Sequence, residues 1–282
     1  MTTPLPGLTL VLGGGGTGGI AWETGVLLGL AEAGSEVLSV TQRVIGTSAG
    51  SAVGAQVLSG LGIEELFGRQ ISEEHGEVMP DFDASLAAAV FTALLGGKPL
   101  DVGARRRIGA AAVTAPTLPP EVRRAVIEWR LPSHQWPTTH LQVTAVDCES
   151  GDLVVFTRDS GVSLVDAVMA SCAVPTMWPV VSIGGRSYMD GGICSPVNAL
   201  LAGDAARVLV LTPLTGPMGA STLVELEQLR ANGSRTAVIS ADDDAIAAMA
   251  NPLDPSCRAP AAEQGRRQGR AAVEQVRLLL AD

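Results

Sequence analysis

One short stretch of the chain has the residue types and spacing of a serine nucleophile: Gly46-Thr47-Ser48-Ala49-Gly50, a Gly-x-Ser-x-Gly pattern. Residues 40–45 before it, which end in Val44 and Ile45, are interpreted as a buried strand, and the mostly small residues over 49–60 predict a closely packed helix. At such a turn the serine backbone is strained and its hydroxyl is exposed, and side chains at both glycine positions would collide with the strand and the helix. The helix also directs backbone N–H groups toward a developing anion. This setting favours a nucleophile over a plain turn.

A second glycine-rich stretch follows a predicted strand at residues 8–12: Gly14-Gly15-Gly16-Thr17-Gly18-Gly19. It fits the Gly-x-Gly-x-x-Gly pattern of dinucleotide-binding folds, but that interpretation requires an acidic residue after the next strand to bind a ribose. The next strand ends in Ile45-Gly46-Thr47-Ser48 instead. We therefore favour the N–H groups of Gly15 and Gly16 as donors to a substrate oxyanion. A glycine turn that binds nothing is the other interpretation.

A serine nucleophile needs a base, and the histidines do not suit that role. No histidine follows residue 140, so the chain order Ser, Asp, late His is unavailable, and we expect His75, His134 and His140 at the surface. The alternative is Asp190, in the segment Tyr188-Met189-Asp190-Gly191-Gly192, where the glycines allow close backbone approach. An aspartate with its ordinary pKa of about 3.9 is a weak base, but apolar surroundings would raise that pKa.

The order of these motifs resembles the patatin-like phospholipase family of lipid acyl hydrolases: a glycine-rich loop, then Gly-Thr-Ser-Ala-Gly, then Asp-Gly-Gly. The segment Ala170-Ser171-Cys172-Ala173-Val174-Pro175 and Asn198 also resemble the family. The resemblance extends roughly over residues 8–202 and is loose over 61–140. One position departs from the family pattern Gly-Gly-Gly-x-Arg-Gly, because Gly18 stands in place of the arginine.

The resemblance implies a catalytic dyad in which Ser48 attacks an ester carbonyl and Asp190 takes its proton. It implies an oxyanion hole at Gly14, Gly15 and Gly16, and neither a metal nor a cofactor. Supporting glycines in the same motifs are Gly19, Gly46, Gly50, Gly191 and Gly192. The missing arginine removes a positive charge near the hole but not the backbone donors. Because the loop is expected at the pocket mouth, we expect an arginine at position 18 to be tolerated.

The wider pattern predicts an α/β fold, a three-layer α/β/α sandwich with a mostly parallel central sheet. Two strand–glycine–helix units, over 8–33 and 40–60, point to parallel strands with covering helices. More strands are predicted at 141–146, 153–156 and 208–211. A helix-like segment is predicted at 196–202, and a helix packed on the sheet at 271–280. Residues 254–268, rich in Pro, Ser, Ala, Arg and Gln, are expected to form a mobile surface loop.

No clean linker interrupts the sequence, so we expect residues 1–282 to form a single patatin-like hydrolase domain. Its middle segment, residues 61–140, is less regular, with acidic clusters and a proline-rich stretch at 116–120. A helical stretch at 84–95 would line an acyl pocket, cover it as a lid, or simply belong to the core.

The composition restricts the class of protein. Of the 282 residues, 46% are hydrophobic and 17% charged, which supplies a large core and excludes global disorder. A net charge of -10 argues against a nucleic-acid binder, whose affinity depends on neutralising phosphates. The cluster Arg105, Arg106 and Arg107 is either a solvated surface or a peripheral contact to anionic lipid head groups.

Features of a membrane or secreted protein are missing from the sequence. No apolar run approaches the length of about 18 residues that spans a bilayer, and no basic residue precedes Arg43, as a secretory signal would require. We expect a cytoplasmic protein whose four cysteines are reduced and mostly fill the core. The oligomeric state stays open.

These observations predict a serine esterase or lipase that cleaves acyl esters, phospholipids among the candidates, through an acyl-enzyme on Ser48. The acyl length and the head group are open. One alternative is a non-catalytic patatin-like protein that binds lipid or a protein partner through the same pocket, for which Gly18 argues. The other is a nucleotide-binding oxidoreductase built on the glycine-rich loop.

Overall fold

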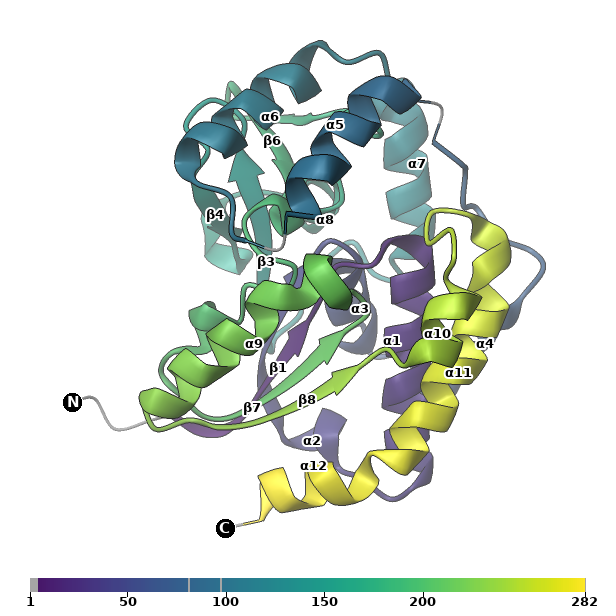
Figure 1. Ribbon diagram of the computed structural model, residues 1–282. Coiled ribbons are helices and arrows are strands. Elements are labelled where there is room, and N and C mark those ends of the chain that lie inside the picture. The colour runs from purple at the N-terminus through teal and green to yellow at the C-terminus, as the bar shows by residue number, and fades with distance from the viewer. Residues whose placement is uncertain (1–4, 81, 97, 282) are drawn as a thin grey trace.

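The computed structural model describes residues 5–80, 82–96 and 98–281, and a mixed, mostly parallel β-sheet lies at its centre (Figure 1). Its strands are β1 (Leu5–Leu12), β2 (Thr41–Thr47), β3 (His140–Asp147), β4 (Leu153–Phe156), β5 (Val181–Ile183), β6 (Arg186–Asp190), β7 (Ala205–Thr212) and β8 (Arg235–Ser240). They lie in the order β5-β6-β3-β2-β1-β7-β8, with β4 paired to β3. Because β3, β2, β1, β7 and β8 run parallel, their carboxyl ends meet at one edge. The predicted fold class is confirmed.

Helices flank this sheet on both faces (Figure 1). They are α1 (Gly16–Glu32), α2 (Val37–Val40), α3 (Ala49–Val57), α4 (Ile63–Ile71), α5 (Ala84–Leu94), α6 (Val102–Thr114), α7 (Pro120–Arg130), α8 (Leu164–Ser171), α9 (Gly216–Ala231), α10 (Asp243–Ala248), α11 (Arg258–Ala271) and α12 (Val273–Leu280). Among the described residues, no helix combines the length and the apolar character needed to cross a bilayer.

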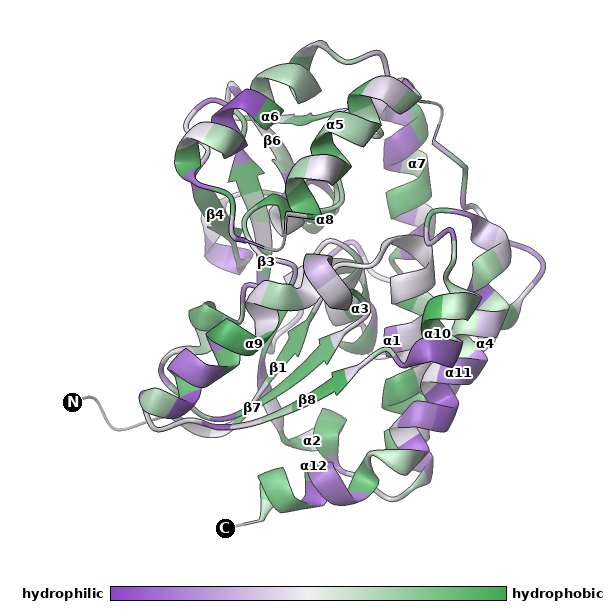
Figure 2. Cartoon of the chain, viewed as in Figure 1, coloured by the Kyte–Doolittle hydropathy of each residue, from purple (hydrophilic) through white to green (hydrophobic). Residues whose placement is uncertain are grey.

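The alternation of side chains along β1 divides the core into two layers. Leu8, Leu10 and Leu12 pack with residues of α1, α3 and α11 on one face of the sheet, whereas Val11 packs with α9 on the other. Figure 2 shows β1, β7 and β8 as largely hydrophobic, as expected for parallel strands that are covered on both faces.

Helix α11 shows that the expectation of a mobile surface loop over 254–268 is wrong. The helix lies along α1 so closely that a Cβ at Gly265 would lie 2.1 Å from the carbonyl oxygen of Trp22. The Trp22 indole N–H donates to Oε1 of Gln268 at 2.7 Å. Glycines and polar residues make this segment a weak helix former in isolation, and much of α11 is hydrophilic (Figure 2). Its stability comes from contact with a helix far away in the sequence.

The middle segment is more regular than expected, because its described residues form the helices α4 to α7. Helix α5 matches the predicted stretch at 84–95 and begins after Asp83, whose side chain accepts N–H groups of the first turn. Of the predicted helical segment 196–202, only Ala199–Ala202 forms a 3₁₀ turn. The helix predicted at 271–280 is α12, which packs against β7 and β8.

The tight contact between α1 and α11 predicts a large effect of one methyl group. Gly265→Ala should lower the free energy of unfolding by about 1–3 kcal/mol, because the new Cβ collides with backbone that cannot move aside. The matched control is Gly68→Ala on α4, where a Cβ meets nothing within 4 Å and a better helix former replaces glycine. Urea denaturation of both variants checks the prediction, and equal stabilities would contradict it.

Candidate active site

Ser48 lies at the turn between β2 and α3 with φ 52° and ψ -116°, a conformation that residues other than glycine rarely adopt. Strain of this kind costs on the order of 1–3 kcal/mol and persists where the surroundings impose it. A Cβ at Gly50 would lie 2.1 Å from the carbonyl oxygen of Leu12, and a Cβ at Gly46 would lie 2.5 Å from Cα of Ser51. Only glycines fit at the positions two residues before and two residues after the serine, as the spacing predicts for a nucleophile elbow.

Asp190 lies at the end of β6 and contacts the serine directly, because Ser48 Oγ donates to Oδ2 of Asp190 at 2.7 Å. The register of the sheet explains this contact. Thr47 pairs with Thr144 on β3, and the next residue of β3, Ala145, pairs with Asp190. The central strand β3 therefore brings together two residues that are 142 positions apart in the sequence.

The turn that follows α8 positions the backbones of both residues. Ser171 Oγ accepts the N–H of Ser48 at 2.9 Å, and the carbonyl of Ala173 accepts the N–H of Asp190 at 2.9 Å. Between them, Cys172 Sγ donates to the carbonyl of Ser48 at 3.2 Å. The Ala-Ser-Cys-Ala-Val-Pro segment is thus a structural link between the serine turn and β6.

The Asp190 carboxylate is almost completely removed from solvent, with 4% of the residue exposed. Burial raises its pKa to about 6, although hydrogen bonds from Ser48 and Gly192 and the positive charge of Arg123 lower it. The Gly192 N–H donates to Oδ1 at 2.7 Å, which leaves Oδ2 for the serine. Such a carboxylate is ionised at neutral pH and is more basic than an ordinary aspartate.

The glycine-rich loop reaches the same site where α1 begins at Gly16. Gly14, Gly15 and Gly16 line one cavity together with both side chains of the expected dyad. The N–H of Gly14, however, donates to the carbonyl of Pro196 at 2.8 Å, so we drop it from the expected oxyanion donors. The first N–H groups of a helix have no partner within it, and Gly15 and Gly16 stay as candidates.

Gly18 is buried rather than at the mouth of the pocket, so the expected location, on which the tolerance of an arginine is based, is wrong. Gly18 is buried in the first turn of α1, where a Cβ would lie 2.9 Å from both Cys257 Sγ and Met249 Cγ. A long charged side chain has no room in this packing. At the neighbouring position, a Cβ at Gly19 would lie 3.3 Å from the Cβ of Ala49. The absence of a side chain at Gly19 therefore allows α1 to lie close to α3.

Glu23 is a buried residue of the site that the motifs did not reveal. It lies on α1 and is 0% exposed, and its Oε1 accepts the N–H of Gly13 at 2.7 Å. Burial raises its pKa well above the ordinary value, against a smaller opposite effect of the Gly13 N–H. The side chain therefore holds the start of the glycine-rich loop. The one signal in the sequence is an acidic residue within an otherwise apolar predicted helix.

Asn198, which the resemblance singled out, ties the strand ends together behind the site. Its backbone is left-handed, with φ 50°, and its side-chain N–H groups donate to Thr47 Oγ1 at 3.0 Å and to the carbonyl of Ser195 at 2.9 Å. Gly191 packs against the same place, since a Cβ there would lie 2.3 Å from Thr144 Oγ1. Asn198 is therefore a positioning residue.

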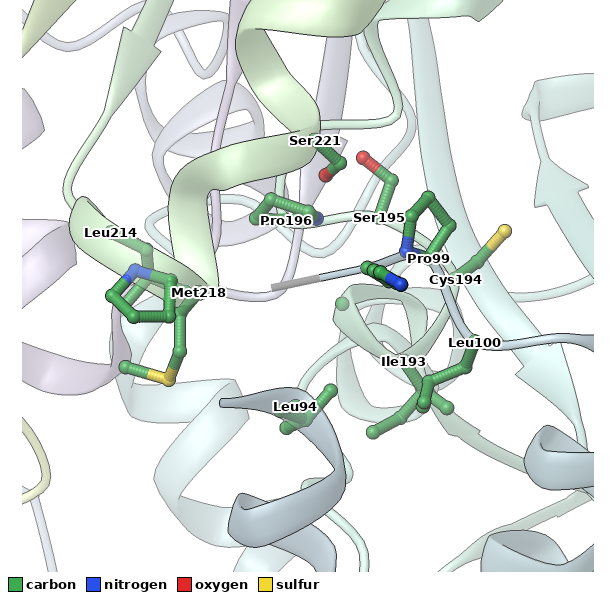
Figure 3. A pocket seen from close by; sticks show the side chains of 13 residues that line it. Leu94, Pro99, Leu100, Ile193, Cys194, Ser195, Pro196, Leu214, Met218 and Ser221 are labelled. Atoms are coloured by element: carbon green, nitrogen blue, oxygen red, sulfur yellow. The ribbon is translucent and has the colours of Figure 1, made fainter. Parts of the chain in front are cut away.

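An apolar cavity of about 320 Å³ lies beside Ser48. Phe91 and Leu94 of α5 form part of its wall, so the helical stretch predicted at 84–95 lines the pocket. A second cavity of about 60 Å³, whose lining side chains are shown in Figure 3, shares Leu94 and Met218 with it. The larger volume is within the range of small-molecule sites, about 300–1,000 Å³.

Comparison with known proteins assigns the chain to a family. A family model described as patatin-like phospholipase matches residues 10–202, more than half of the chain, and the chain therefore belongs to the patatin-like phospholipase family. Members of this family are typically serine hydrolases, and membership implies lipid acyl hydrolase activity. No curated protein matches the chain.

Three solved structures are similar to the chain. VipD from Legionella pneumophila is 13% identical with a TM-score of 0.47, and the match covers 96% of this chain and 68% of that one. The type III effector protein ExoU is 17% identical with a TM-score of 0.45, over 97% of this chain and 54% of that one. A chain of the SpcU–ExoU complex from Pseudomonas aeruginosa is 17% identical with a TM-score of 0.42, over 99% and 53%. This chain spans about half the length of the ExoU chains.

The raised pKa of Asp190 predicts a pH dependence of Ser48 reactivity. Only the ionised carboxylate accepts the serine proton, so the rate of labelling by a fluorophosphonate should fall about tenfold per pH unit as the pH drops below about 6. Labelling rates across this range, with circular dichroism to verify the fold, check the prediction. A rate that stays level down to the ordinary aspartate pKa of about 3.9 would show that the base is not a buried carboxylate.

Proposed function

We propose that the protein is a serine acyl hydrolase that cleaves lipid-type esters with Ser48 as nucleophile and Asp190 as base. The observation that carries this proposal is the hydrogen bond of 2.7 Å from Ser48 Oγ to the buried carboxylate. Nucleophile and base must lie within hydrogen-bond distance, and the base needs a pKa near the working pH. Membership of the patatin-like phospholipase family supports the same chemistry.

In the first step, Ser48 Oγ attacks the ester carbonyl carbon while Asp190 Oδ2 takes the hydroxyl proton. The carbonyl π electrons move onto oxygen, and the N–H groups of Gly15 and Gly16 at the start of α1 would stabilise that anion. When the tetrahedral intermediate collapses, the bond to the alcohol oxygen breaks, and the alcohol leaves with the proton from Asp190. An acyl ester on Ser48 and an ionised Asp190 result.

In the second step, water replaces the alcohol. Asp190 removes a proton from the attacking water, a second tetrahedral anion forms at the same donors, and the proton returns to Ser48 Oγ as the acyl bond breaks. The products are a free acid and the original enzyme. Besides the leaving alcohol and the attacking water, only the two residues of the dyad change their protonation state.

The shape and lining of the cavity support an acyl chain as the group that binds beside Ser48. Of the residues in its wall, Phe91, Leu94, Val174, Met177 and Met218 are apolar. Burial of each methylene group of a chain in such surroundings contributes about 0.8 kcal/mol. A peripheral contact of Arg105, Arg106 and Arg107 with anionic lipid stays a prediction.

The second candidate is a patatin-like protein that binds lipid without cleaving it. The observation in its favour is Gly18, which leaves the glycine-rich loop without a charged side chain. Such a protein would bind a fatty acyl ligand in the same cavity, but a fluorophosphonate would not label Ser48. Labelling of the parent protein therefore distinguishes the two candidates.

The dyad is tested by three variants and one control. Ser48→Ala and Asp190→Asn should each lower kcat for a p-nitrophenyl ester by at least on the order of 10³-fold, and the double variant should be little worse, because the two residues act as one unit. Asp243→Asn, at an exposed aspartate on α10, should keep the parent rate. Steady-state kinetics of folded variants provides the test. Additive losses in the double variant would assign Asp190 a purely structural role.

The three histidines are the other side chains that could act as the base. All three are exposed: His75, His134 and His140. None lines the cavity beside Ser48. Substitution of each by alanine should leave the hydrolysis rate close to that of the parent, and a large loss in any of them would revive a Ser–His mechanism.

A further inference from the structure

Arg123 is a buried cation that forms no direct ion pair with a carboxylate of the described residues, although the charges of Glu77 and Asp190 act on it from a distance. It lies on α7 and is 4% exposed. Its guanidinium stacks on the Trp178 ring at 3.8 Å from the centroid and donates to the carbonyl of Cys172 at 3.4 Å. Its Nε has no hydrogen-bond partner, and among the described residues no carboxylate forms an ion pair with it. A buried charge is expensive unless something pairs with it.

The neighbouring arginine shows the contrast. Arg130, the last residue of α7, is also buried, but Glu77 accepts two hydrogen bonds from it, at 3.0 and 2.6 Å. That carboxylate pairs directly with Arg130, whereas Arg123 interacts with Glu77 and Asp190 only through their charges. Burial, and to a lesser degree the charge of Arg130, lowers the pKa of Arg123 to about 10, so it is protonated at neutral pH.

Arg123 lines a third, very small cavity that also borders Ser48. This cavity measures about 20 Å³, enough for one oxygen-sized group. Its wall includes Gly16, Ser48, Ala49 and Arg123, and also Arg130, which is paired with Glu77. Two helices begin at it, α1 at Gly16 and α3 at Ala49. Gly16 and Ser48 also line the larger apolar cavity, so the two cavities meet at the nucleophile.

We propose that this cavity receives the oxyanion of the tetrahedral intermediates and that Arg123 is a catalytic residue that stabilises it. The proposal rests on the proposed hydrolase function. When Ser48 attacks a carbonyl whose substituents lie in the apolar cavity, the new anion points into the small one. There it meets the N-terminal ends of α1 and α3 and the guanidinium of Arg123, whereas the second arginine of the wall, Arg130, is paired with Glu77.

The position of Arg123 also explains where the site obtains its positive charge. Residues 13–19 of the glycine-rich loop carry no charged side chain. The middle segment supplies a cation through α7 instead, close enough to Asp190 to lower the pKa of that carboxyl. In surroundings of low polarity, one charge beside a developing anion has a much larger effect than at the surface.

The experiment compares Arg123→Met with Arg124→Met, a neighbour that is partly exposed and pairs with Asp166. For a p-nitrophenyl ester, Arg123→Met should lower kcat on the order of 10²-fold with little change in KM, the usual effect of a lost oxyanion donor. Arg124→Met should match the parent. The acid limb of the pH profile should also move to higher pH in Arg123→Met, because a charge that lowers the pKa of Asp190 is gone.

A pair of inhibitors separates stabilisation of the anion from a purely structural role. Ser48 adds to the carbonyl of an alkyl trifluoromethyl ketone and forms an adduct with a negatively charged oxygen. The matching secondary alcohol has no carbonyl, so it binds without forming such an adduct. Arg123→Met should weaken the ketone by the same factor as kcat and leave the alcohol unchanged. Equal weakening of both inhibitors, or parent-like kcat in the folded variant, would overturn the proposal.

A second variant covers the case in which Arg123→Met does not fold. Arg123→Lys keeps a charge but loses the planar group, so the ratio of ketone to alcohol affinity should fall by a smaller factor; an unchanged ratio would overturn the proposal. Measurements on the parent protein distinguish failure of the proposed hydrolase function from failure of the inference about Arg123. If it neither hydrolyses the ester nor adds the ketone, the proposed function fails. If the parent is active and Arg123 variants equal it, the inference about Arg123 alone fails.

Discussion

The hydrogen bond between Ser48 and Asp190 depends on a serine backbone that the rest of the structure holds in a strained conformation. Gly50 maintains that conformation, because its backbone lies against the Leu12 carbonyl and its N–H donates to Gly13 at 2.8 Å. These contacts join β1, the glycine-rich loop and α3 into one unit. The contact of α1 with α11 extends the unit outward, since α1 begins in the loop and packs on α3. The strained conformation of Ser48 is thus held by contacts with several helices and strands.

Burial then determines which side chains of the site are ionised. It raises the pKa of Asp190 to about 6 and that of Glu23 well above its ordinary value, so the site has one carboxylate that ionises near neutrality and one that resists ionisation. Arg123 and Arg130 both line the small cavity beside Ser48, and of the two only Arg130 pairs directly with Glu77. A protein that uses aspartate rather than histidine as a base needs such an arrangement, because an exposed aspartate is too weak a base.

The features that local spacing determines could be predicted from the sequence. A serine between two glycines after an apolar strand, and an aspartate before two glycines, indicate tight turns whatever surrounds them, and the apolar segments indicate a parallel sheet. What was missed depends on distant contacts. Helix α11 is stable only against α1, Gly18 is buried by residues near the other end of the chain, and the N–H of Gly14 is bonded to Pro196. Arg123 has no motif around it, and its place became visible only in three dimensions.

The measurement that tests the central claim most directly is the site of acylation. The protein is mixed with a slowly hydrolysed p-nitrophenyl ester, quenched in acid within the first turnover and analysed by mass spectrometry, intact and after digestion. We expect one acyl group per chain, on the peptide that contains Ser48, and no acyl group on that peptide in Ser48→Ala. An acyl group on a different residue, or hydrolysis that proceeds without any covalent adduct, would contradict the role of Ser48 as the nucleophile.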